Sequence, residues 1–129
     1  MQIKSFVTEF IYEEDDNTFE FHFEFESDGL KSTVFISEPY LNSYEEWKKM
    51  IDAIKNNEKY DLGFYCGNGI GTMECNGENL LFIAMPSGAG GDIEVSASIS
   101  IKKYKDILIK NIQSLIDHEY AQKYWTKNK

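Results

Sequence analysis

The sequence predicts an α+β protein, with a largely antiparallel sheet of about seven strands packed with two amphipathic helices in the order βββαββββα. Three observations favour this class. Residues 18–26 read Thr-Phe-Glu-Phe-His-Phe-Glu-Phe-Glu, an alternation with period two that is typical of a half-buried strand. Two later segments carry apolar residues at helical spacing. Asp28-Gly29 and Asn76-Gly77 are pairs that favour tight hairpin turns.

The first three strands are expected to form a meander. Residues 3–12 are rich in β-branched and aromatic side chains, and the acidic run at 13–17 is typical of a solvated hairpin tip. In the strand at 18–26, four phenylalanines point to one face, so a one-residue slip would expose all of them and the register should be firmly set. Asp28-Gly29 then leads into a third strand at 30–37.

A helix is predicted next, because Ser43-Tyr44-Glu45-Glu46 matches a capping box. An apolar stripe with the spacing of one helix face follows, at Trp47, Met50, Ile51 and Ile54. Asn56-Asn57-Glu58 should end this helix.

A hairpin around Asn76-Gly77 follows a short strand at 60–66. A two-residue loop would place Cys75 opposite Glu78, joining strands at 70–75 and 78–85. Apolar side chains occupy both faces of this hairpin, so we expect both faces to be covered.

The chain ends with a loop, a strand and a helix. Residues 86–91 read as a flexible glycine-rich loop, and residues 92–100 alternate as a half-wet strand. From Lys102 the apolar period becomes helical, and Tyr120, Tyr124 and Trp125 could extend the same stripe. With 129 residues and no linker in the pattern, we expect a single domain spanning residues 1–129.

The charge is strongly negative and unevenly distributed. The formal net charge is −9, and residues 1–38 hold ten acids against two lysines, whereas residues 39–129 hold twelve against eleven. All thirteen basic residues are lysine, so the planar fork that arginine offers to phosphate and guanine is absent from the sequence. Direct binding to nucleic acid is therefore disfavoured. No apolar run reaches the roughly 20 residues that a membrane helix needs.

The cysteines and histidines give no pattern of a cofactor or metal site. Cys66 and Cys75 are the only cysteines, and their spacing to His22 and His118 matches no zinc motif. Because the N-terminal residues lack a secretory signal, we expect a cytoplasmic protein with two free thiols. No cofactor and no metal are expected.

The sequence also contains no convincing catalytic signature. The glycines at 67–71 and 87–91 are followed by strands rather than by a helix N-terminus, so turns are favoured over phosphate cradles. The carboxylates of the strand at 18–26 lie on an exposed face rather than in a cleft. We therefore expect a binding protein and not an enzyme.

The candidate binding surface is the acidic part of the first hairpin. A row of like charges on a rigid sheet would steer a basic partner and speed its arrival, although a merely solvated face explains the same row. Tyr12 is included as a possible aromatic anchor. The candidate residues are Tyr12, Glu13, Glu14, Asp15, Asp16, Glu20, His22, Glu24 and Glu26.

The layout resembles the small acidic immunity proteins of bacterial polymorphic toxin and contact-dependent inhibition systems. The resemblance rests on the N-terminal meander, the Asn-Gly hairpin, the glycine-rich loop before Gly-Asp-Ile-Glu-Val-Ser-Ala-Ser-Ile-Ser at 91–100, and the final amphipathic helix. It implies a cytosolic inhibitor that binds one cognate toxin, often a basic nuclease, and it carries over no catalytic residues.

Two other functions stay open from the sequence. A phage-type antidefence protein could use its acidic row to imitate nucleic-acid phosphates. A small-ligand binder or enzyme could use a pocket framed by the glycine-rich loops. The sequence does not decide between a monomer and a homodimer.

Overall fold

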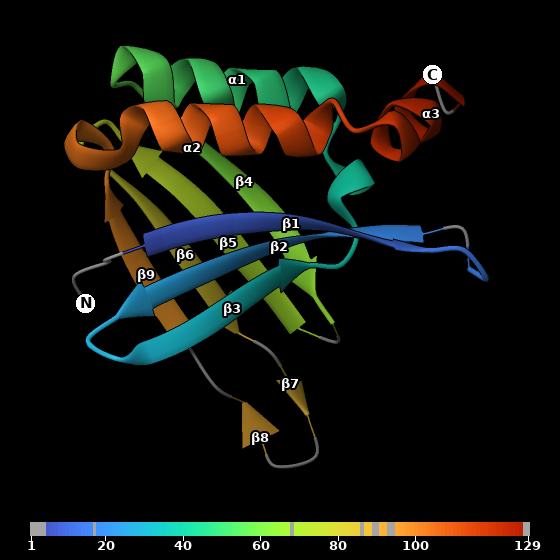
Figure 1. The fold of residues 1–129 in the computed structure, drawn as a ribbon, viewed down its shortest axis with the longest axis horizontal. Coiled ribbons are helices and arrows are strands. Elements are labelled where there is room, and N and C mark those ends of the chain that lie inside the picture. Colours follow the sequence, from blue (N-terminus) through green and yellow to red (C-terminus); the bar gives the residue numbers. More distant parts are fainter. Residues whose placement is uncertain are drawn as a thin grey trace.

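The fold is seen in a computed structural model, which describes residues 5–16, 18–67, 69–85, 87–88, 91–92 and 95–127. The elements are β1 (Ser5–Glu13), β2 (Thr18–Ser27), β3 (Leu30–Ile36), the short 3₁₀ helix η1 (Pro39–Leu41), α1 (Tyr44–Asn56), β4 (Lys59–Cys66), β5 (Gly69–Asn76), β6 (Asn79–Met85), β7 (Ser87–Gly88), β8 (Gly91–Asp92), β9 (Val95–Ser100), α2 (Ile101–Ile116) and α3 (Glu119–Lys127). The predicted α+β class and strand order are confirmed. The strands divide between two antiparallel sheets: sheet A, ordered β1-β2-β3, and sheet B, ordered β4-β5-β6-β9 (Figure 1).

Sheet A is the predicted meander. Its turn at Asp28-Gly29 has both residues at positive φ, 50° and 82°, which is the backbone that a tight two-residue turn requires. Ser27 pairs directly with Leu30 across this turn. All four phenylalanines of β2 are at most 1% exposed, so the one-sided strand predicted from the alternation is confirmed.

The hairpin around Asn76-Gly77 differs from the prediction in register. Cys75 pairs with Leu80 rather than with Glu78, so four residues instead of two lie between the last paired positions of the two strands. The Asn76 side chain accepts hydrogen bonds from the backbone N–H groups two and three positions on, at 2.9 and 2.8 Å, and this geometry lengthens the turn. Because the shift is two residues, the side chains keep their predicted faces.

The expectation that both faces of this hairpin are covered is wrong. On the outer face of sheet B, Ile70 is 56% exposed and Met85 is 38% exposed, while Leu81 and Ile83 are half-buried. The physical reason is the arrangement of the layers. Helices α1 and α2 and sheet A all pack against the same inner face of sheet B (Figure 1).

Helix α1 begins as predicted. The Ser43 side chain accepts a hydrogen bond from the N–H of Glu46 at 3.1 Å, and the Glu46 carboxylate accepts the N–H of Ser43 at 3.3 Å, which completes the capping box. At the other end, Asn57 takes the left-handed conformation with φ 57° and closes the helix.

The last helical region is two helices rather than one extended stripe. Asp117 and His118 separate α2 from α3, and α3 turns away to pack beside η1 (Figure 1). The Trp125 indole N–H donates to the Asn42 carbonyl at 3.0 Å, which holds α3 on the segment before α1. Of the three aromatic residues that the helical spacing predicted as an extension of the stripe, Trp125 is buried and Tyr120 and Tyr124 are half-buried, but the spacing did not predict the break between the two helices.

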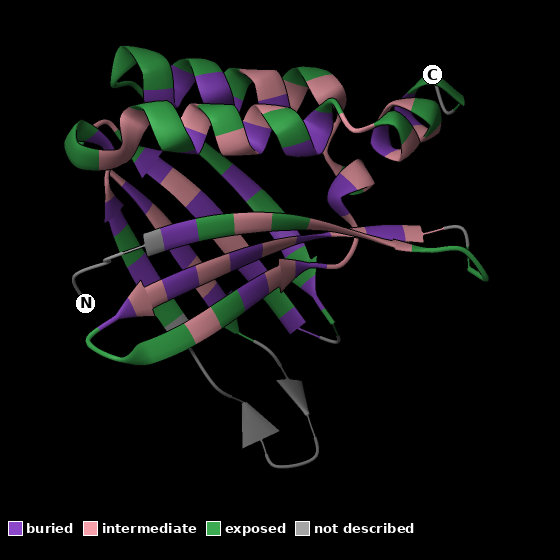
Figure 2. Cartoon of the chain, viewed as in Figure 1, coloured by how far each residue is buried: buried purple, intermediate pink, exposed green. Residues whose placement is uncertain are grey.

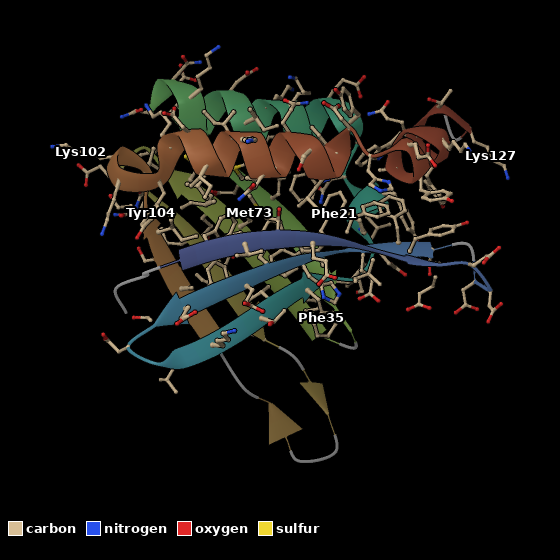
Figure 3. The ribbon with its side chains drawn as sticks, viewed as in Figure 1. Phe21, Phe35, Met73, Lys102, Tyr104 and Lys127 are labelled. Carbon is tan, nitrogen blue, oxygen red and sulfur yellow. The ribbon has the colours of Figure 1, made fainter. Side chains whose placement is uncertain are left out.

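One continuous core joins both sheets and the helices. Phe23 of β2 lies 4.9 Å from Phe82 of β6, measured between ring centroids, and Phe21 meets the edge of Trp47 at 5.4 Å. Buried and exposed residues alternate along the strands of both sheets (Figure 2). Phe21 from sheet A and Met73 from sheet B both point into this interior (Figure 3).

The loop predicted at 86–91 and the start of the strand predicted at 92–100 lie partly outside the described residues. Within the described part, Ser87–Gly88 and Gly91–Asp92 form a short antiparallel pair. Strand β9 is described over Val95–Ser100, where Ala97 and Ile99 are buried and Ser96 and Ser98 are exposed, as the alternation predicts.

Candidate functional site

The candidate site is the outer face of sheet A together with the tip of its first hairpin, which we call the acidic face. The buried phenylalanines of β2 force the alternate residues Glu20, His22, Glu24 and Glu26 outward, where all four are half-buried. The acidic face comprises Glu9, Glu13, Glu14, Asp15, Asp16, Glu20, His22, Glu24 and Glu26.

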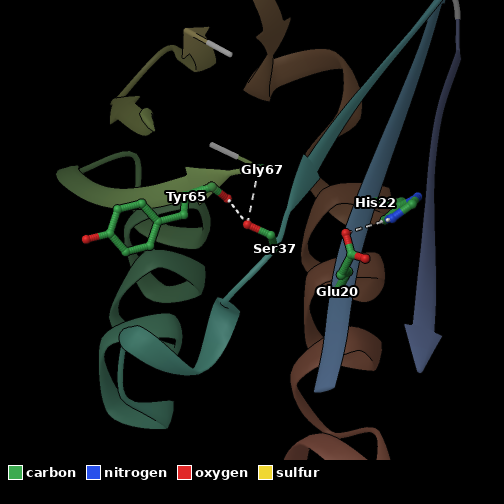
Figure 4. Close-up of polar contacts among 5 residues, drawn as sticks. All are labelled: Glu20, His22, Ser37, Tyr65 and Gly67. Atoms are coloured by element: carbon green, nitrogen blue, oxygen red, sulfur yellow. Dashed lines mark hydrogen bonds and ion pairs between the residues drawn. The ribbon is translucent and has the colours of Figure 1, made fainter. Parts of the chain in front are cut away.

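His22 lies at the centre of the acidic face. Its Nε2 atom is 3.6 Å from a carboxylate oxygen of Glu20 (Figure 4). Across the strands it is flanked by Glu9 on β1 and Phe35 on β3, the latter with a ring separation of 5.9 Å. The Nε2 atom is buried and makes no hydrogen bond within the described structure.

The acidic face has little internal compensation. Among its described neighbours on sheet A the basic side chain is Lys31, whose Nζ lies 3.9 Å from a carboxylate oxygen of Glu24. Both groups are well exposed, so this ion pair contributes little to stability. A field of uncompensated carboxylates is thus presented to solvent, and it would attract a cationic surface over about 10 Å at ordinary ionic strength.

Tyr12 does not lie on the acidic face. It occupies the opposite side of β1, where its ring stacks on Tyr120 of α3 with centroids 4.0 Å apart and planes 3° from parallel. Next to this pair, the ring of His118 stacks on Phe10 at 3.7 Å. These contacts join α3 to the end of β1, so the structure assigns Tyr12 a packing contact and separates it from the other candidates.

Sequence reasoning missed Glu9 as part of the site. Glu9 pairs directly with His22, which places a further carboxylate beside the histidine. The alternation of residues 3–12 puts Glu9 opposite the core side, but its neighbour on β2 depends on the length of the acidic turn. That turn spans four residues between the paired Glu13 and Thr18.

The two sheets meet at a seam beside the acidic face. Ser37, just after β3, donates its backbone N–H to the carbonyl of Tyr65 on β4 at 2.9 Å, and its hydroxyl donates to the same oxygen at 3.0 Å. The same hydroxyl accepts the N–H of Gly67 at 3.2 Å (Figure 4). These hydrogen bonds join the end of β3 to β4, although β3 and β4 do not pair as strands of one sheet.

A shallow apolar hollow of about 350 Å³ lies beyond this seam. Its lining residues are Leu41, Gly63, Phe64, Tyr65, Ile70 and Gly71. The Tyr65 hydroxyl is the polar side-chain group in this lining, which includes no carboxylate, imidazole, amine or thiol. The glycines at 67–71 act as turn and strand residues, and Gly67 has φ 61° in the turn between β4 and β5.

Both cysteines are free thiols in the interior, as predicted. Burial raises the pKa of the Cys66 thiol and of the Cys75 thiol, which keeps both protonated and lowers their nucleophilicity. The Cys75 thiol also donates to the carbonyl of Glu58 at 3.1 Å. In the part of the chain that the structure describes, no cluster of three side chains could hold a metal ion.

None of the described helices is long and apolar enough to cross a membrane. Comparison of the chain with protein-family models, curated proteins and solved structures gives no match. The acidic face must therefore be interpreted from its own geometry and charge.

Proposed function

We propose that this protein is a non-enzymatic inhibitor that captures a basic protein through its acidic face, and that it serves as an immunity protein against a cognate bacterial toxin. The observation that carries the proposal is the concentration of carboxylates on one rigid sheet with Lys31 as their described counter-charge. Such a surface accelerates association with a cationic partner and repels acidic competitors.

The geometry of the acidic face supports protein binding. The outward carboxylates of β2 stand on a strand whose opposite face is fully buried, so their positions are fixed before a partner arrives. Preorganisation of this kind reduces the entropy lost on binding. We place the encounter in the cytoplasm, a compartment that suits two unpaired thiols.

The test is affinity capture of partners from the source cells with the intact protein, read by mass spectrometry. The decisive variant is Glu20→Lys/Glu24→Lys, which reverses the centre of the acidic face. We expect the captured partner to be basic and to be lost in this variant, and the association rate of the purified pair to fall as salt is added.

The matched control is Asp61→Lys/Glu74→Lys. These two residues face each other on the outer face of sheet B, so the control makes the same charge change on paired strands elsewhere. Capture should survive in the control. A partner that binds both variants equally, with an association rate indifferent to salt, would contradict the proposed surface.

A second function is favoured by the regular spacing of the acidic row. Alternate residues of a strand stand about 7 Å apart, so Glu20, His22, Glu24 and Glu26 present a linear array that could occupy the nucleic-acid channel of an effector. This phage-type mimic is distinguished by competition. An effector's nucleic-acid substrate should displace a mimic, whereas inhibition at a surface away from that channel would leave substrate binding intact.

A further inference from the structure

Strand β9 forms the outer edge of sheet B and pairs on one side with β6. One hydrogen bond shows which residues of β9 point their backbone N–H and C=O groups toward β6 and which point them away. The N–H of Ile101 donates to the carbonyl of Glu78 at 2.9 Å, in the same register that pairs Asn79 with Ser100. In an antiparallel ladder, hydrogen-bonded pairs alternate with pairs whose polar groups point apart.

This alternation leaves polar backbone groups at the open edge. Ile99 and Ala97 are two and four residues before Ile101, so they exchange hydrogen bonds with β6. Ser96 and Ser98 fall between them and direct their N–H and C=O groups away from β6. Within the described residues, no other segment bonds to these groups.

The opposite edge of sheet B shows what a covered edge looks like. By the same alternation, Gly63 and Tyr65 of β4 point their backbone groups outward. Their carbonyl oxygens accept hydrogen bonds from the Asn42 side-chain amide at 2.8 Å and from the Ser37 N–H at 2.9 Å. The segment between β3 and α1 therefore covers the β4 edge and provides donors for these two carbonyl groups.

The edges of sheet A are also protected. Helix α2 packs against β1, and β3 carries the exposed Lys31 and ends at the seam with β4. Charged side chains and covering elements are the usual ways in which proteins prevent edge-to-edge pairing. Among the described residues, no segment hydrogen-bonds to the open edge of β9, and Val95–Ser100 contains no charged residue and no proline.

We propose that β9 is a dimerisation edge, which pairs antiparallel with β9 of a second copy around a two-fold axis at Ser98. Donors and acceptors alternate along this edge, so two identical edges are complementary when they run antiparallel. Ser98 faces its own counterpart at the axis, and Ser96 lies opposite Ser100 of the second copy. The two four-stranded sheets become one continuous sheet.

Charge favours a second copy at this edge. The chain carries a net charge of −9, and the excess lies in its first 38 residues, which form sheet A and its turns. Pairing through β9 brings two uncharged strands together and leaves both acidic faces open to solvent. Self-association through sheet A would instead oppose two negatively charged surfaces.

The experiment is sedimentation velocity with light scattering on the full chain over a wide concentration range. We expect a species of twice the 14.9 kDa chain mass that dissociates on dilution. Ser98→Pro removes the outward N–H and spares the ladder to β6, so it should weaken the dimer by about ten- to a hundredfold. The control Ser98→Ala keeps the backbone donor and should leave the dimer unchanged.

A second variant keeps the test valid if the proline impairs folding. Ser98→Lys places two ammonium groups opposite each other at the two-fold axis, on an exposed position that tolerates lysine in the monomer. It should also yield monomers, with an unchanged circular dichroism spectrum. A chain that is monomeric at every concentration, or a dimer that survives Ser98→Lys, would overturn the proposal. If the chain is a monomer and Ser98→Lys abolishes its capture of another protein, then β9 pairs with a strand of that protein. This result would also overturn the proposed dimer.

Discussion

Sheets A and B bury their inner faces together but present different outer faces. The outer face of sheet A carries the carboxylates of Glu9, Glu20, Glu24 and Glu26, whereas that of sheet B exposes apolar side chains such as Ile70 and Met85. Sheet A tolerates its row of like charges because burial of its phenylalanines stabilises it by more than the charge repulsion costs. Each fully buried phenylalanine of β2 contributes about 1.5–3 kcal/mol, while like charges facing each other on a strand cost a few tenths of a kcal/mol.

The inner faces differ as well, and the difference makes them fit. Sheet A contributes large rings, and sheet B contributes smaller side chains around Phe82, including Met73 and Ala84. Gly71 of β5 shows the same complementarity within sheet B, because the ring of Phe64 on the neighbouring β4 fills the space that a side chain would occupy there. Large groups thus pack into the room left by small neighbours, which is how interiors reach close packing.

The largest expected effect comes from the aromatic face of sheet A. Phe21→Ala removes a ring with 0% exposure that contacts Trp47, so unfolding in urea should show a loss of about 3–5 kcal/mol. The control Leu30→Ala truncates a side chain that is 66% exposed and should change stability by less than about 0.5 kcal/mol. Equal effects from the two variants would mean that the rings of β2 are not the main source of stability.

A smaller effect is expected from closing the space in sheet B. In Gly71→Ala, the new Cβ would lie 2.6 Å from Phe64 ring atoms and 2.7 Å from the backbone oxygen of Ile83, so overpacking should cost about 1–3 kcal/mol. Gly63→Ala on the neighbouring strand is the matched control, because its Cβ would meet nothing nearer than 4.0 Å. This control should be neutral or stabilising by about 0.4–1 kcal/mol, since it restricts the unfolded chain. Thermal and urea unfolding of both variants give the comparison.

Local patterns predicted the parts of the fold that local chemistry decides. Alternation fixed the faces of β2, the capping box placed the start of α1, and Asp28-Gly29 set the first tight turn. The Asn76-Gly77 turn was wrong by two residues because the Asn76 side chain hydrogen-bonds into the loop, which composition does not reveal.

Features that depend on distant contacts were not predictable in the same way. The outer face of sheet B is exposed because both long helices pack on its inner face. No local sequence pattern shows whether a second layer covers a given face of a strand. Tyr12 was grouped with the acidic residues by its position beside them, yet its partner Tyr120 lies on the last helix. Glu9 needed the pairing of β1 with β2 to appear beside His22.

The smallest expected effect concerns the acidic face itself. Neutralising Glu20 and Glu24 as Glu20→Gln/Glu24→Gln removes repulsion on β2, and it also removes the exposed ion pair of Glu24 with Lys31 and the contact of Glu20 with His22. These opposing contributions are each a few tenths of a kcal/mol, so stability should stay within about 0.5 kcal/mol of the parent in low salt and converge with it as salt is added. Urea unfolding at two ionic strengths measures the change in stability and its dependence on salt. The control Asp61→Asn/Glu74→Gln removes a facing acid pair from sheet B, and its stability should also stay within about 0.5 kcal/mol of the parent. A loss of several kcal/mol on sheet A alone would show that its carboxylates hold the fold together. A near-zero change means that any loss of partner capture on altering Glu20 and Glu24 reports on recognition and not on folding.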